Sequence, residues 1–112
     1  MSIKKKFLKL TEYEKNLLIH DEILEQTDSR FFFFKDGDFI SKAVYLRPRN
    51  FLKFFGLLPK NTFYFESVYE DEDGNKENLY TVEFEDCSIF VQTEDPILSV
   101  ILALIEWKEI SI

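Results

Sequence analysis

The chain has 112 residues, a formal net charge of -7, 46% hydrophobic residues and 17% aromatic residues. This length allows one hydrophobic core and is too short for two ordinary domains, so we expect a single domain over residues 1–112. The hydrophobic content excludes a disordered chain. The single cysteine, Cys87, excludes an internal disulfide, and the apolar runs are too short for a signal peptide or a membrane span. We therefore expect a cytoplasmic protein that makes no contact with a membrane.

Charge is distributed unevenly along the chain. Residues 1–60 carry 12 basic and 8 acidic side chains, a balance of +4, whereas residues 61–112 carry 2 basic and 13 acidic side chains, a balance of -11. Fields of this size govern association with other molecules rather than the choice of fold. The acidic part predicts a basic protein partner, and the acidic total argues against direct binding to nucleic acid.

Thr11 and Glu14 have the spacing of a capping box, in which each side chain accepts from a backbone N–H at the start of a helix. An amphipathic helix is predicted from there to residues 26–29. Its buried stripe is predicted to contain Tyr13, Leu17, His20 and Leu24.

A β-hairpin is predicted over residues 30–46. Asp36-Gly37 suits a two-residue type I′ turn, which would place Phe34 opposite Phe39. Both faces of this hairpin are apolar. It is therefore predicted to lie in a sheet covered on both sides, or to use one aromatic face for docking.

A second hairpin is predicted over residues 62–85, with residues 71–75 as an acidic tip, followed by a short strand at residues 89–92. Glu66, Glu83 and Glu85 are expected to share one face of its sheet. Asp95-Pro96 predicts the start of a last helix, because Asp is a favoured N-cap and Pro is tolerated at the first helical position. This helix is apolar on nearly every side, which predicts burial under the sheet or a homodimer formed through it.

Together these elements predict an α+β fold. The predicted domain has an antiparallel sheet of four to five strands, built from two hairpins and flanked by an N-terminal amphipathic helix and a C-terminal apolar helix.

The sequence contains no motif that predicts catalysis, a cofactor or a metal. Aligning Gly74 with the invariant glycine of an EF-hand places Tyr69 and Tyr80 at ligand positions, which excludes that type of calcium site. His20 is predicted to be structural, because general base catalysis needs a positioned second group. Cys87 is interpreted as an inert apolar filler on a strand. We therefore expect no enzymatic activity, no cofactor and no metal.

The acidic second hairpin is the predicted partner-binding surface. It suggests a small inhibitor of the immunity, antitoxin or anti-defence type, which blocks a basic, nucleic-acid-handling protein. One alternative is a self-associating structural or adaptor protein without catalytic activity. A second is a small-ligand-binding domain or an enzyme with an aromatic-lined pocket between sheet and helix. The candidate partner-binding residues are Glu66, Glu70, Asp71, Glu72, Asp73, Glu77, Glu83 and Glu85.

Overall fold

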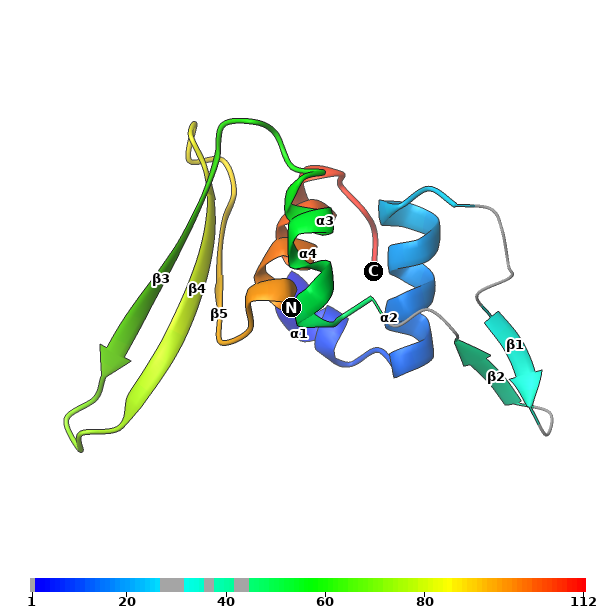
Figure 1. Ribbon diagram of the computed structural model, residues 1–112, viewed down its shortest axis with the longest axis horizontal. Coiled ribbons are helices and arrows are strands. Elements are labelled where there is room, and N and C mark those ends of the chain that lie inside the picture. The colour runs from blue at the N-terminus through cyan, green and yellow to red at the C-terminus, as the bar shows by residue number, and fades with distance from the viewer. Residues whose placement is uncertain (1, 27–31, 36–37, 42–44) are drawn as a thin grey trace.

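The computed structural model describes residues 2–26, 32–35, 38–41 and 45–112, with the backbone alone described for residues 32–35 and 38–41. Within these residues, the strands form two antiparallel sheets, β1-β2 and β3-β4-β5 (Figure 1). The predicted α+β class is confirmed, but the predicted single sheet of four to five strands is wrong. In chain order the elements are α1 (Ile3–Leu8), α2 (Glu12–Leu18), the π-helical turn η1 (Ile19–Ile23), β1 (Phe32–Lys35), β2 (Asp38–Ser41), the 3-10 turn η3 (Pro48–Asn50), α3 (Phe51–Phe55), β3 (Thr62–Glu70), β4 (Lys76–Phe84), β5 (Phe90–Thr93) and α4 (Pro96–Trp107).

The first hairpin has the predicted register, since Phe34 pairs with Phe39 and Phe32 pairs with Ser41. The predicted Asp36-Gly37 turn and the two side-chain faces of this hairpin lie outside what the structure describes. The hairpin lies beside α2, on the opposite side of the molecule from the three-stranded sheet (Figure 1).

Tyr45 explains why the first hairpin does not join the three-stranded sheet. The Tyr45 N–H donates to Asn16 Oδ1 at 3.0 Å, and the Tyr45 hydroxyl lies 2.9 Å from His20 Nδ1. Tyr45, the first described residue after β2, is therefore held by α2 and η1. Pro48 then begins η3, which leads into α3, and this helical segment separates the strands of the two sheets along the chain.

The predicted capping box is present: Thr11 Oγ1 accepts from the Glu14 N–H, and Glu14 Oε1 accepts from the Thr11 N–H. The predicted buried stripe is displaced, because the buried residues of this helical segment are Asn16, Ile19, His20 and Ile23. Asn16 tolerates burial because it bonds the backbone twice, donating to the Glu12 carbonyl and accepting from Tyr45. A helix at the N-terminus, α1, was not predicted; it buries Phe7 and is capped by Ser2.

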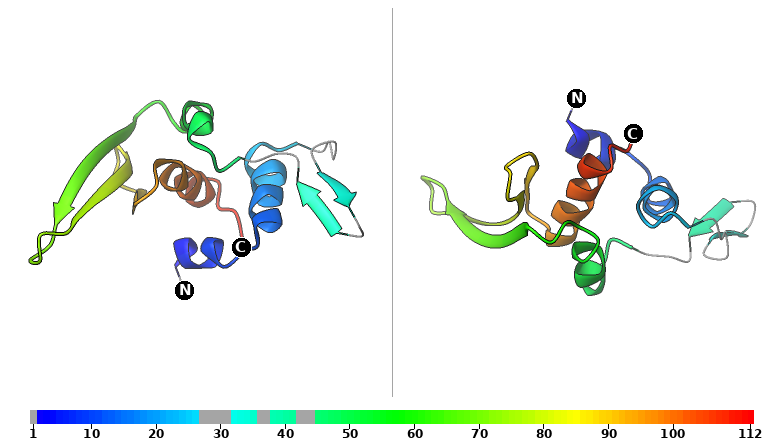
Figure 2. Two further views of the ribbon diagram at one scale, coloured as in Figure 1. Left: turned by 60° about the horizontal axis from the view of Figure 1, so that its bottom comes forward. Right: turned by 90° about the horizontal axis from the view of Figure 1, so that it is seen from above.

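Helix α4 is the centre of the core. It lies between the three-stranded sheet and the α2 segment, and it also contacts α1 and α3 (Figures 1 and 2). The Asp95 side chain accepts from the Ile97 N–H, as the predicted N-cap requires. Every residue from Ser99 to Ile105 is buried, so the chain itself covers this apolar helix without a second copy. The Ser99 hydroxyl donates to the Tyr80 carbonyl at 2.7 Å and ties α4 to the sheet.

The second hairpin extends beyond this core. β4 pairs with β3 over nine residues, from Thr62↔Phe84 to Glu70↔Lys76, but pairs with β5 only from Tyr80 to Glu83. The distal part, residues 66–79, therefore projects from the remaining structure (Figures 1 and 2). We call this distal part the arm, and we call the helices, β5 and the base of the sheet the body.

Candidate partner-binding surface

The arm presents its side chains to solvent on both faces. Every residue from Glu66 to Asn78 is exposed except Asp71, which is partly buried. The nine-residue ladder between β3 and β4 holds the arm in an extended, twisted ribbon. The acidic residues of the arm are thus positioned by backbone hydrogen bonds and are accessible from several directions.

The tip of the arm is ordered by Asp71. Its Oδ1 atom accepts from the backbone N–H groups of Asp73 and Asn75, both at 2.9 Å, and its Oδ2 atom accepts from the Asn75 side chain. These hydrogen bonds favour the charged form and hold the pKa of Asp71 below its usual value. Gly74 closes the turn with a φ of 84°, a backbone conformation that other residues adopt at a cost. Asp71 therefore builds the tip, while Glu70, Glu72 and Asp73 present exposed carboxylates.

The predicted acidic residues occupy two faces rather than one. Glu66 pairs with Tyr80 and Glu83 pairs with Phe63, so the alternation of a strand places Glu66 and Glu83 on opposite faces. The expectation that Glu66, Glu83 and Glu85 share one face is therefore wrong. Glu85 lies just after β4, where its N–H donates to the Asn61 carbonyl at the base of the sheet. The predicted set is therefore spread over both faces of the arm, over its tip and onto this base.

Glu94 lies beside these acidic residues, although the sequence analysis did not include it among the candidate partner-binding residues. Its side chain shares a hydrogen bond with Glu77, and this contact, followed by burial and by charge repulsion, raises the pKa of Glu77. The pairing of Tyr80 with Thr93 brings Glu94 next to the arm. The sequence predicted a strand at residues 89–92, but no local pattern specified its register against β4. The position of Glu94 beside Glu77 therefore could not be predicted.

The outer face of the three-stranded sheet carries exposed aromatic rings. Val82, Phe84 and Val91 are buried on the inner face against α4, so the alternate residues of each strand face outward. Thr81, on the outer face, is nevertheless fully buried between its cross-strand neighbours Phe65 and Gln92. The exposed outer rings are Phe63, Phe65, Tyr69 and Phe90, which are between 43% and 58% exposed.

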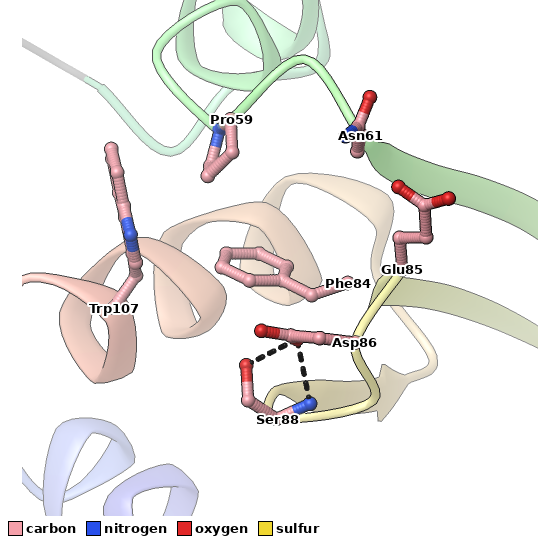
Figure 3. A pocket seen from close by; sticks show the side chains of 7 residues that line it. All are labelled: Pro59, Asn61, Phe84, Glu85, Asp86, Ser88 and Trp107. Atoms are coloured by element: carbon pink, nitrogen blue, oxygen red, sulfur yellow. Dashed lines mark hydrogen bonds between the residues drawn. The ribbon is translucent and has the colours of Figure 1, made fainter.

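An open pocket of about 390 Å³ lies at the base of the arm, between the end of β4 and the end of α4. Phe84 and Trp107 form an aromatic floor, with their ring centroids 6.3 Å apart at 70°. Figure 3 shows the Asp86 carboxylate pointing toward Trp107 from the same side as the Phe84 ring. Asp86 Oδ1 accepts from both the N–H and the hydroxyl of Ser88, and these bonds lower the pKa of Asp86. The pocket therefore combines aromatic rings with a carboxylate that stays ionised.

Cys87 is next to this pocket, in the turn between β4 and β5. It is exposed and has a φ of 61°, so the prediction of an apolar filler on a strand is wrong. β4 ends at Phe84, one residue before the predicted end of the hairpin at residue 85, and residues 85–88 form a turn that Asp86 closes.

His20 is buried and bonds Tyr45, which places it in the packing between α2 and the chain after β2. Among the described residues, no group of three or more His, Cys, Asp or Glu side chains is arranged to hold a metal ion. In the same part of the chain, no helix combines the length and the apolar character needed to cross a membrane. No protein-family model matches this chain, and neither a curated protein nor a solved structure matches it.

Proposed function

We propose that this protein is a small acidic inhibitor that binds a basic, nucleic-acid-handling protein through its arm and blocks it. The observation that carries the proposal is the projection of residues 66–79 from the body with exposed carboxylates on both faces and at the tip. Such an arm can enter a basic cleft and place carboxylates where phosphate groups would bind.

The energetic cost of the arm supports a role in binding. Like charges close together on a strand pair destabilise it by about a few tenths of a kcal/mol each. Glu77 lies beside Glu94, and their hydrogen bond, burial and mutual repulsion raise the pKa of Glu77, while the charge of Lys4 opposes this rise. A basic partner would relieve that repulsion on binding.

The pocket at the base of the arm suits a positively charged side chain of the same partner. A guanidinium or ammonium group attracts the faces of aromatic rings and pairs with carboxylates. Phe84, Trp107, Glu85 and Asp86 provide both kinds of group around one open volume. An arginine or lysine seated there would fix the orientation of the arm in the partner's cleft.

The test begins with affinity capture of the partner, followed by titration of a triple variant in which Glu70, Glu72 and Asp73 are each changed to Lys. Asp71 stays unchanged, because its hydrogen bonds build the tip. The matched control reverses the exposed carboxylates Glu12, Glu22 and Glu25 on the α2 segment and its end, with the same change in net charge. We expect the arm variant to weaken binding at least tenfold and the control to leave it nearly unchanged.

Salt dependence and a pocket variant complete the test. The association rate should fall steeply with ionic strength while the dissociation rate changes less, because surface charges mainly steer encounter. Asp86→Asn keeps an oxygen that can accept from Ser88 but removes the charge, and it should weaken the complex. Equal loss of affinity in both triple variants would show that net charge alone acts, and a partner without a basic site would refute the inhibitor.

A further inference from the structure

Among the described residues, the outer edge of β3 is the longest strand edge without a partner. In the sheet order β3-β4-β5, β3 is an edge strand of nine residues, whereas the other edge strand, β5, has four. Residues Ser2–Lys4 at the start of α1 lie beside β5, with which they line a shallow pocket. No described strand pairs with the outer edge of β3.

This edge carries two charged side chains, Glu66 and Glu70, but it lacks the other usual protections against pairing with another chain. Exposed edge strands are commonly shortened, bulged, or broken by lysine or proline. β3 contains none of these, because its residues pair one-to-one with β4 along nine positions and include no lysine, arginine, proline or glycine. Its outer edge is therefore a template for a further strand.

The outward-facing hydrogen-bonding groups belong to the even-numbered residues of β3. The Glu85 N–H donates to the Asn61 carbonyl and the Asp71 N–H donates to the Asn75 carbonyl, so the odd-numbered residues between them bond β4. The N–H and C=O groups that point away from β4 are those of Thr62, Tyr64, Glu66, Val68 and Glu70.

We propose that a second copy of this chain pairs with this edge, β3 against β3 in antiparallel orientation, with Phe65 on the two-fold axis. Two three-stranded sheets then become one six-stranded sheet. In this register Tyr64 lies opposite Glu66 of the other copy, and the two Phe65 rings meet on the outer face, where each is 43% exposed in the single chain.

Charge selects this register among its neighbours. A two-fold axis at Glu66 would place Glu66 directly opposite itself, and like charges opposite each other destabilise a strand pair. An axis at Phe65 instead brings Glu70, at the end of each β3, beside Lys60 of the other copy, which lies in the turn before Thr62, so that opposite charges meet at both ends of the strand pair. Both residues are exposed. In this register the acidic arm of one copy also lies beside the start of the other copy's β3. That start follows residues 1–60, which carry a net positive charge.

The first test measures the mass of the complete chain in solution by sedimentation, where one chain has a mass of 13.4 kDa. Val68→Pro removes an outward N–H without removing a hydrogen bond to β4, so we expect it to weaken the dimer about tenfold or more. Val68→Ala, the matched control, keeps the N–H and should remain a dimer. Circular dichroism checks that each variant is folded.

A charge exchange and a cross-link test the register. Lys60→Glu and Glu70→Lys should each weaken the dimer, and the two changes combined should restore it. In a Cys87→Ser background, Phe65→Cys should form a disulfide between copies, because facing residues on the axis have Cα atoms about 4.5 Å apart. Ser67→Cys should not cross-link, because Ser67 lies opposite Phe63 of the other copy. The Ser67 of that copy is four residues farther along its strand.

A native chain that is monomeric at about 100 µM would overturn the proposal. A dimer that withstands Val68→Pro, or one that cross-links through Ser67→Cys rather than Phe65→Cys, would also overturn it. These measurements need no other protein, so their outcome is independent of the proposed inhibitory function.

Discussion

The body and the arm use their side chains in opposite ways. In the body, α4 buries seven consecutive residues, from Ser99 to Ile105, and its contacts join the sheet to three other helical segments. In the arm, the residues of a β-hairpin leave nearly every side chain in solvent, including the aromatic ring of Tyr69. The comparison indicates that stability comes from the body, because burial of apolar area is the main favourable term in folding. The arm is therefore free to carry charge.

The largest expected effect comes from placing a charge in the body. Leu102→Asp introduces a carboxylate at a position that is 2% exposed, and the change should cost about 3–5 kcal/mol in free energy of unfolding. Thermal unfolding followed by circular dichroism measures this loss. The control is Leu52→Asp on α3, where the side chain is 79% exposed and the melting temperature should barely change. Equal losses in both variants would show that α4 is not the centre of stability.

Asn16→Ala tests the polar contact that anchors the chain after β2 to α2. The change leaves the buried Tyr45 N–H without its acceptor and should cost about 1–3 kcal/mol. Urea unfolding measures the difference. Asn78→Ala removes the same side chain from an exposed site in the arm and should be nearly neutral. A neutral Asn16→Ala would mean that the contact with Tyr45 does not hold the two segments together.

Gly74→Ala should affect the arm and spare the body. No atom lies within 4 Å of the added methyl group, so the cost is the positive φ of 84°, about 1 kcal/mol. Hydrogen exchange should become faster in residues 66–79 while the amides of α4 keep their protection. Asp73→Ala, at the neighbouring exposed position, serves as the control. Faster exchange throughout α4 would show that the arm and the body unfold together.

The smallest effect concerns Glu77, whose pKa is raised by its hydrogen bond with Glu94. Because the pKa is higher in the folded than in the unfolded state, protonation of Glu77 contributes stability at low pH, and this contribution is lost as pH rises through the folded-state pKa. Glu94→Gln removes the neighbouring charge and should lower the pKa of Glu77 toward its ordinary value. A carboxyl NMR titration of native and variant proteins measures both values. An unchanged pKa would place the two side chains apart in solution.

Several local features followed from the sequence because they depend on residues close together in the chain. The capping box of Thr11 and Glu14, the register of the first hairpin and the N-cap at Asp95 each involve groups within about ten residues of one another. The burial of α4 followed from its apolar pattern, because no polar face remained to contact water. The acidic character of the second hairpin also required only the composition of residues 61–112.

Tertiary contacts decided what local patterns left open. The bond between Tyr45 and Asn16 joins residues 29 positions apart, and it fixes the first hairpin away from the other strands. Packing of α4 on Val82 and Val91 decides which face of the three-stranded sheet is buried. The alternate residues of each strand, including those of the arm, then lie on the opposite face. The pocket of Phe84, Asp86 and Trp107 likewise exists because the end of α4 meets the end of β4. Sequence by itself therefore determined most of the elements and the charge of this protein, and packing determined which of those charges and rings are exposed.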